Sequence, residues 1–464
     1  MIKRFTRTAT PLALAMALAG CMSLAPRYER PAAPVAASFP ELAPGAAAGA
    51  AASGIAWQQF FADARLKQLI ELALANNRDL RVAILNIEQA RAQYQIRRAD
   101  TLPSVSAGAS GSRAVGSEDS IRSTYSAGLV VSAFELDLFG RVRSLSDAAL
   151  AQFFATEEAR KATHISLVAS VANAYLQLLA DEELLALTQK TLDARLESLK
   201  LVQLKYDNGV VSKLDLQQSL SLVDSARVTL AQQRRLRAQG TNLLTLLVGQ
   251  TLPETLAPGT TLAGTMLSEL PGGLPSDLLA VRPDIRAAEQ QLIAANANIG
   301  AARANFFPRI SLTGSAGSVS SELSGLFKSG SFGWSFAPQM VLPIFDHGRN
   351  SATLGSARAG REIAVAQYEK SVQTAFREVA DGLAGQATFS EQLRAQRAVA
   401  DAEAERFNLS DLRYRSGASS YLDLLDAQRS LFAAQQAAVQ ANLQRLQNQV
   451  TLYRVLGGGW TAAQ

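Results

Sequence analysis

The sequence predicts a mainly helical, internally duplicated protein with a membrane β-barrel. Each protomer would supply a long α-helical barrel segment and four β-strands, and three protomers would complete a twelve-stranded barrel in a trimer. Three observations predict this fold. Long Ala-, Leu-, Gln- and Arg-rich stretches with few prolines are typical of extended helices. The same landmarks recur at constant spacing in both halves, and short Gly- and Ser-rich segments between the helices alternate apolar and polar residues. At 464 residues the chain also exceeds the range in which one hydrophobic core keeps growing.

The N-terminus has the pattern of an export signal followed by a lipid attachment site. Residues 1–20 form the predicted signal peptide, in which three basic residues precede an apolar run that is too short to span a bilayer. The run ends at Leu18-Ala19-Gly20-Cys21, which resembles the lipobox of bacterial lipoproteins and implies that Cys21 is acylated. Cys21 is the only cysteine, and the alternative is an incidental cysteine beside an ordinary cleavage site. No later segment has about 18 consecutive apolar residues, so any membrane crossing is expected to be a barrel.

Matching landmarks indicate that a whole structural half was duplicated. The halves align without a gap up to residue 111, and from residue 140 the spacing between them is three residues longer. Chance similarity between Ala- and Gln-rich helices would not place proline, glycine and tyrosine at one fixed spacing. The matched pairs include Asp79/Asp284, Arg98/Arg303, Pro103/Pro308, Gly140/Gly348, Arg141/Arg349, Tyr206/Tyr414, Gly209/Gly417, Ser212/Ser420 and Asp215/Asp423.

This duplication divides the chain into a series of expected segments. After a lipidated N-terminal segment at 21–65 come a first repeat at 66–252, an equatorial linker at 253–275, a second repeat at 276–457 and a tail at 458–464. The first repeat is expected to hold a helix over 66–99, a β-hairpin at about 102–136 and a long helical hairpin at about 141–249. The second is expected to hold a helix, a β-hairpin at about 308–343 and a helical hairpin at about 349–456.

The helical hairpins are predicted from the absence of helix breakers and from a heptad pattern. No glycine lies between Gly140 and Gly209, and a helix over 141–207 would be ~100 Å long at ~1.5 Å per residue. Its counterpart at 349–415 has the same length but contains four glycines. Apolar residues recur every seven positions from Val171 to Tyr206, which favours a left-handed supercoil. Turns ending in Gly209 and Gly417 then send each chain back.

The segments between the helices predict four strands that cannot close a barrel alone. Their apolar positions alternate with serine, threonine and glycine, as in outer-membrane barrels, although Pro338 is unfavourable within a paired strand. Single-chain barrels begin at about eight strands, so oligomerisation is expected. A dimer would enclose a filled interior, whereas a trimer would leave an open lumen. The alternative is a soluble protein with one sheet packed on the helices.

Several motifs resemble the TolC family of outer-membrane efflux proteins, in its lipidated OprM/NodT branch. They are Trp57-x-x-Phe60, the run at 282–317, PIFDHGRN at 343–350 and YRSGASSYLDLLDAQRSL at 414–431. The resemblance implies a homotrimer in the outer membrane that is anchored by lipid and extends into the periplasm. It also implies the channel of a tripartite efflux system, a passive export duct gated at its periplasmic end. The implied partners are a periplasmic adaptor and an inner-membrane pump of the RND type, with no cofactor.

The resemblance also assigns a periplasmic gate. Asp423 and Asp426 match the constricting aspartates of the family, and Leu422 matches a hydrophobic ring. Rings of aspartate in a narrow pore would attract cations. Tyr414 and Asp215 match a pair that ties the inner hairpin to the outer one.

One gate position departs from the family pattern. Ser419 stands where TolC has an arginine, so one ionic lock is absent, and Arg429 is the candidate replacement. The hairpin tips are the expected surface for the adaptor. Their contact residues would be Gly209, Val210, Ser212, Gly417, Ser419 and Ser420.

Other interpretations of these residues remain open from the sequence. Asp215 and Asp423 follow tip glycines closely, where a carboxylate near a helix N-terminus is favoured by the helix dipole alone. Tyr414 and His164 lie at heptad positions and could be core residues, and His347 has no companion ligands at metal-binding spacing.

The sequence also weighs against two other classes of function. The net charge of +5 comes from interspersed acidic and basic residues, which argues against nucleic-acid binding. No nucleophile elbow, phosphate loop or paired-histidine motif indicates an enzyme. The main alternative function is a non-transporting, lipid-anchored periplasmic coiled-coil scaffold. The sequence does not identify the exported compound.

Overall fold

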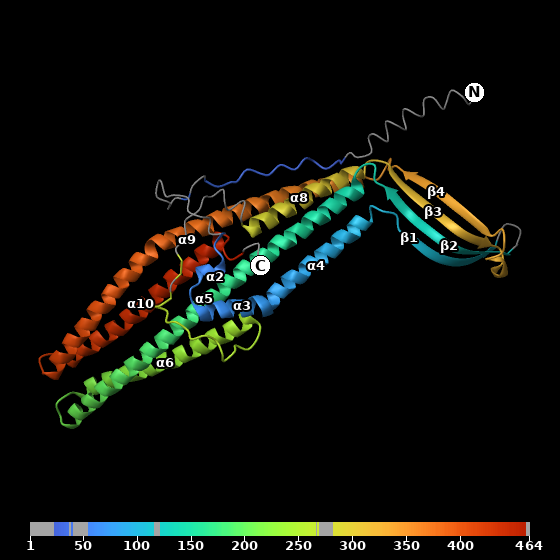
Figure 1. The fold of residues 1–464 in the computed structure, drawn as a ribbon. Helices are drawn as coiled ribbons and strands as arrows, with labels where there is room; N and C mark the ends of the chain where they lie inside the picture. The colour runs from blue at the N-terminus through green and yellow to red at the C-terminus, as the bar shows by residue number, and fades with distance from the viewer. Residues whose placement is uncertain are drawn as a thin grey trace. The chain divides into compact units, whose positions relative to one another are not determined.

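The computed structural model describes residues 23–36, 39, 54–115, 121–265, 267–268 and 282–460. The predicted signal peptide and Cys21 lie outside the described residues, as do parts of the expected linker and C-terminal tail. The chain divides into two compact units (Figure 1). Unit 1 comprises Met1–Ala33, Leu85–Glu158 and Arg286–Ser371, and unit 2 comprises Pro34–Ile84, Ala159–Ile285 and Val372–Gln464.

Unit 1 contains a single antiparallel sheet with the strand order β1-β2-β3-β4 (Figure 1). Both predicted hairpins are present and join through the pairing of β2 with β3. The strands are β1 (Val105–Val115), β2 (Ile121–Leu136), β3 (Arg309–Ser320) and β4 (Phe332–Val341).

The register confirms the predicted alternation of apolar and polar residues. One cross-strand row contains Ala107, Leu129, Ala316 and Trp334, because each residue pairs with the next across the sheet. The neighbouring row lies on the opposite face, where the hydroxyls of Ser315 and Ser335 are 2.7 Å apart. The sheet therefore has one mainly apolar face and one face rich in serine and glycine.

The helices of the chain do not cover the edge strands of the sheet. Every residue of β1 and of β4 is exposed, and Trp334 alone exposes 76% of its surface. The alternative of a sheet packed on the helices is therefore wrong for these two strands. Pro338 lies in β4 opposite Leu312, and β4 is an edge strand in this chain, where proline is tolerated.

A row of glycines crosses all four strands on the face opposite Trp334. Gly108 pairs with Gly128, Gly128 with Gly317, and Gly317 with Gly333. A Cβ added to Gly128 would lie 2.6 Å from the Cα of Gly317, and one added to Gly317 would lie 2.5 Å from the Cα of Gly128. The backbones of β2 and β3 therefore approach too closely at this level for any side chain.

Beside the sheet, unit 1 packs helices through small residues. Helix α8 (Pro283–Ala304) contacts the first part of α5 (Arg141–Asp207). The shared core consists of Ala148, Ala151, Ala294 and Ala297. Alanines at these positions let the two helix backbones approach closely.

Unit 2 contains α5 from Ala159 onward with α6 (Lys213–Val248), and α9 (Arg349–Arg415) from Val372 onward with α10 (Tyr421–Val455). Helices α5 and α9 have the predicted bounds. Two of the α9 glycines face α10 closely, because a Cβ on Gly382 would lie 3.0 Å from Leu452 and one on Gly385 would lie 2.4 Å from Asn448. These glycines serve close packing between the helices and do not break α9.

The helix predicted over 66–99 is wrong in one respect, because it is two helices. Helix α3 (Ala64–Asn76) ends before Asn77, which has an extended backbone, and α4 (Arg78–Ala99) begins after it. The Asn77 side chain accepts a hydrogen bond from the Leu80 amide at 2.9 Å and donates one to the Leu247 carbonyl at 2.8 Å. Asparagine is a favourable N-cap, and here it also binds the end of α6.

Two absences apply to the described part of the chain. None of its helices is both long enough and apolar enough to cross a membrane. The same residues contain no group of three or more histidine, cysteine or acidic side chains that could hold a metal ion.

The end of the described chain in unit 2 docks on His164 of α5. The Trp460 ring lies edge-on to the imidazole with centroids 5.0 Å apart, and the Arg160 guanidinium lies 4.6 Å over the Trp460 ring. Burial lowers the pKa of His164 most, and the charge of Arg160 lowers it further. A hydrogen bond to the Gly459 backbone raises the pKa by less, so that it lies at about 4. His164 is therefore a neutral packing residue, as one of the sequence interpretations held.

This burial predicts a pH-dependent loosening of residues 456–460. Because the folded pKa of about 4 is below the ordinary 6.5, His164 binds more protons in this range when residues 456–460 have left it and exposed its ring. The stabilisation is complete above pH ~6.5 and is lost as the pH falls towards 4, by up to about 3 kcal/mol. We expect hydrogen exchange of residues 456–460, corrected for intrinsic rates, to accelerate between pH 7 and pH 5. A His164→Gln control should show no such pH dependence, and equal behaviour of both proteins would contradict the assignment.

Candidate functional site

The two hairpin tips share one turn design. Two residues beyond the ends of α5 and α9 lies a glycine in the left-handed conformation, Gly209 with φ 72° and Gly417 with φ 77°. The amide of Val210 donates to the Lys205 carbonyl and that of Ala418 to the Arg413 carbonyl, both at 2.8 Å. This pattern is the Schellman motif, in which glycine avoids backbone strain.

The carboxylates that follow the tips cap the returning helices. Ser212 and Asp215 form a reciprocal capping box at the start of α6, and Ser420 and Asp423 form the same box at the start of α10. Asp215 accepts a hydrogen bond from the Ser212 amide at 3.0 Å. The structure therefore gives both aspartates the helix-capping role that the dipole argument allows.

Behind the tips, aromatic and aliphatic side chains pack the two hairpins together. Tyr414 and Tyr421 are buried, with ring centroids 5.5 Å apart, and the Lys205 ammonium lies 4.0 Å over the Tyr414 ring. This tip cluster draws on all four hairpin helices. Its buried members are Val202, Leu216, Leu222, Tyr414, Tyr421, Leu424 and Leu425.

The predicted tie between Tyr414 and Asp215 is not a hydrogen bond in this structure. The hydroxyls of Tyr414, Tyr421 and Ser419 are buried without a hydrogen-bond partner among the described residues. Burial raises the pKa of Tyr414, and Tyr421 and Asp215 raise it further, so Asp215 acts on Tyr414 through its charge. Packing therefore accounts for the position of Tyr414.

The other predicted gate residues lie on an exposed face of α10. Leu422 is 58% exposed, and Asp423, Asp426 and Arg429 are also exposed. Asp426 accepts a hydrogen bond from Arg406 of α9 at 2.5 Å, which partly compensates its charge. No ion pair of Arg429 occurs among the described residues.

Arg195 and Arg406 are two residues near the tips that the sequence did not single out. Arg195 is 5% exposed, donates to the Leu222 carbonyl at 3.0 Å and lies 5.2 Å from the ring centroid of Phe432 on α10. Burial lowers its pKa, and the charge of Arg429 lowers it further. A heptad count alone could not have found a buried arginine or an ion pair between α9 and α10.

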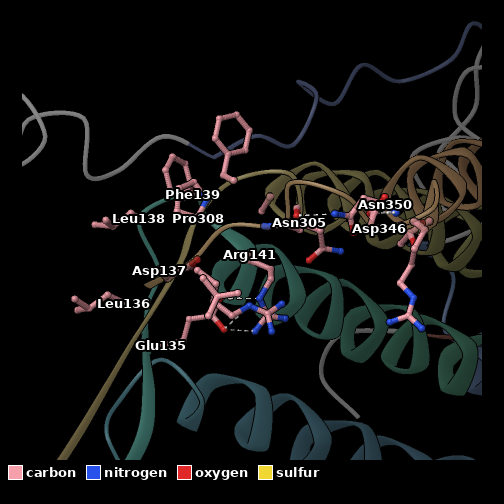
Figure 2. A pocket seen from close by; sticks show the side chains of 17 residues that line it. Glu135, Leu136, Asp137, Leu138, Phe139, Arg141, Asn305, Pro308, Asp346 and Asn350 are labelled. Carbon is pink, nitrogen blue, oxygen red and sulfur yellow. Dashed lines mark hydrogen bonds and ion pairs between the residues drawn. The ribbon is translucent and has the colours of Figure 1, made fainter. Parts of the chain in front are cut away.

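Unit 1 contains a separate pocket of about 510 Å³ where the strands lead into the helices (Figure 2). Arg141 holds Glu135 through two hydrogen bonds of 2.8 and 2.6 Å, and Arg309 approaches the same carboxylate at 3.5 Å. Asp137 and Asp346 bind backbone amides at the starts of α5 and α9. These carboxylates therefore stabilise chain reversals, and the repeated Gly-Arg pairs at 140 and 348 were the sequence signal for this junction.

The geometry therefore defines a class of protein. A sheet with one mainly apolar face and exposed edge strands, together with paired helical hairpins, is typical of a membrane-associated protein. The chain belongs to the outer membrane efflux protein family, because the sequence profile of that family matches residues 69–250 and 274–458. This confirms the family expected from the sequence.

Individual relatives agree with the family assignment. The antibiotic efflux pump outer membrane protein ArpC of Pseudomonas putida is 50% identical over 98% of this chain and 96% of the relative. The toluene efflux pump outer membrane protein TtgC of the same species gives the same identity and coverage. The crystal structure of the open state of the MtrE outer membrane channel of Neisseria gonorrhoeae is 42% identical, covering 94% of this chain and 98% of that one, with a TM-score of 0.87.

The chain is accordingly an outer-membrane efflux channel protein and not an enzyme. Its solved neighbours are outer membrane channels, which decides against the non-transporting scaffold.

Two substitutions of Tyr414 test whether packing or a hydrogen bond keeps the two hairpin tips together. Because its hydroxyl has no hydrogen-bond partner in the described part of the chain, we expect Tyr414→Phe to conduct ions like the wild type in planar bilayers. Tyr414→Ala would remove a buried ring at a cost of about 3–5 kcal/mol and should raise the open probability or conductance. A large rise in Tyr414→Phe would instead show that a hydrogen bond holds the tips.

Proposed function

We propose that three copies of this chain form a continuous duct that is closed at rest at the hairpin tips. The sheet supports the proposal most directly, because its edge strands β1 and β4 are exposed and free to pair. Three such sheets supply twelve strands, with the mainly apolar face towards lipid and the serine- and glycine-rich face towards a lumen.

The proposed cargo is small organic molecules, including antibiotics and aromatic solvents. Relatives that are 50% identical over nearly the whole chain are named for antibiotic and toluene efflux. The described lumen face supports a permissive duct, because its hydroxyls pair across strands, as in Ser110 with Ser126 at 2.8 Å. Because hydroxyl groups are neutral, such a face does not discriminate strongly between solutes of different charge.

We further propose that the tips receive a periplasmic adaptor, which connects the duct to an inner-membrane pump of the RND type. Val210 is 69% exposed, and both tips present a glycine followed by an exposed residue and a serine cap. Acylation of Cys21 would attach the protein to outer-membrane lipid.

The gate proposed here combines packing with exposed charge. The tip cluster would hold the hairpins together, while Leu422, Asp423 and Asp426 would line the constriction on α10. Arg406 would moderate the negative charge of Asp426 through their ion pair.

This gate predicts opposite effects of two charge substitutions. We expect purified wild-type protein to form heat-dissociable trimers on gels and to give step conductance in planar bilayers. Arg406→Gln should leave Asp426 uncompensated and increase cation selectivity, whereas Asp426→Asn should decrease it. The reversal potential in a salt gradient measures both changes. Unchanged reversal potentials in both variants would rule out a carboxylate ring, and absence of conductance would overturn the duct itself.

The tip surface predicts a loss of efflux without a loss of assembly. Val210→Asp and Ala418→Asp keep the turn glycines, so the hairpins should form, but each adds a charge to the docking surface. We expect both to lower efflux-dependent resistance strongly while trimer amounts stay normal. Val228→Asp on α6 is the matched control, because Val228 is also 69% exposed. Wild-type resistance in both tip variants would show that the adaptor does not dock at the tips.

A further inference from the structure

Arg195 of α5 lies at a position where a coiled coil normally has an apolar residue. It follows Leu192 of the heptad pattern by three residues, which places it at the second apolar position of the heptad. It lies between two hydrophobic clusters of unit 2, one that includes Leu192 and one that includes Val202. Arg195 is nevertheless a charged residue, and only 5% of its surface is exposed.

No carboxylate compensates this buried charge in the described part of the chain. Arg195 forms no ion pair there, and its Nε atom is buried without a hydrogen-bond partner. Asp181, a buried carboxylate at the same heptad position of α5, lies two heptads away, which is ~21 Å along the helix. The remaining contacts of Arg195 are the hydrogen bond to the Leu222 carbonyl at 3.0 Å and the ring of Phe432.

A second cation adds to the cost of burying Arg195. Arg429 lies three residues before Phe432 on α10, so both residues face the same side of that helix. The charge of Arg429 repels that of Arg195, as the lowered pKa of Arg195 indicates. The contact between α5 and α10 therefore brings two like charges together, and one of them is out of water.

The duplicated half shows that a helical hairpin does not need a cation at this position. Arg195 lies eleven residues before Tyr206. The matching tyrosine of the second half is Tyr414, and eleven residues before it lies Glu403. Glu403 keeps 23% of its side chain exposed and pairs with Arg406 at 3.4 Å. The second hairpin thus has a paired acid where the first has an unpaired, buried base.

We propose that Arg195 and Arg429 raise the free energy of the arrangement in which the hairpin ends pack together, so that the proposed gate is poised to open. Taking a charge out of water without a counterion is costly, and an apolar residue of similar volume is often more stabilising. The Leu222 carbonyl does not depend on Arg195, because it lies inside α6, where the amide four residues on is its regular partner. Separation of α10 from α5 would return Arg195 to water and move the two cations apart. This inference rests on the proposed gating role of the tips.

Hydrogen exchange of residues 414–432, the tip turn and the first part of α10, measures how often the hairpin ends separate. We expect Arg195→Met to slow this exchange at least about tenfold, because methionine fills the space without a charge. Arg195→Lys keeps the charge and should not slow it. Arg227→Met is the matched control, since Arg227 is on α6 but lies at the surface, in an ion pair with Asp224 at 2.9 Å. A purely structural role of Arg195 predicts the reverse, so unchanged or faster exchange in Arg195→Met would overturn the proposal.

Arg429 supplies a second test that leaves the buried side chain in place. Because Arg429 is exposed, Arg429→Gln should fold normally and slow the exchange by a smaller factor than Arg195→Met. In the Arg195→Met protein the same substitution should have no further effect, since the buried charge that it relieves is gone. Equal slowing in both backgrounds would show that Arg429 acts independently, and it would overturn the coupling between the two charges.

Conductance in planar bilayers separates this inference from the proposed duct. We expect Arg195→Met to lower the open probability at least about tenfold, measured in a Tyr414→Ala background so that openings are frequent enough to count. Slower exchange in Arg195→Met without conductance in any protein, the wild type included, would support the buried-charge effect and contradict the duct. Normal conductance with an unchanged open probability in Arg195→Met would overturn the inference and leave the duct intact.

Discussion

The backbone ladder between β2 and β3 is the interaction on which the architecture depends. β1 with β2 comes from one half of the duplicated chain and β3 with β4 from the other, and only the β2–β3 pairing makes them one sheet. An isolated two-stranded hairpin is marginally stable at best in water. The glycine pair of Gly128 and Gly317 lets these two strands approach closely. The ends of β2 and β4 and the starts of the long helices α5 and α9 line one pocket of unit 1.

Most of the fold could be predicted from the sequence, because its signals are periodic and long. The ends of α5 and α9 follow from glycines at the tips, and the strand faces follow from alternation that the register confirms. Asn77 is a favourable N-cap residue, so the sequence carried a local signal for the break between α3 and α4. The hydrogen bond from Asn77 to the Leu247 carbonyl could not be predicted, because Leu247 is far away in the chain.

The sequence placed the proposed gate residues at and just after the hairpin tips, but it did not reveal the contacts that these residues make. The spacing of Asp215 and Asp423 after the tip glycines is compatible with both a pore ring and a helix cap, and the structure shows that the cap is formed. Arg406, which pairs with Asp426, is twenty residues away on another helix, so no local motif connects the two. Likewise, the unpaired hydroxyl of Tyr414 is a property of its surroundings and not of its heptad position.

The repeated tip turn has a consequence for stoichiometry. Within each chain the tips at Gly209 and Gly417 share the left-handed glycine, the backbone hydrogen bonds and the serine cap, but differ in side chains such as Val210 and Ala418. A threefold assembly of such chains would have nearly sixfold symmetry at this end. A binding protein that recognises only the shared backbone turn would find six equivalent positions, whereas one that recognises the differing side chains would find three.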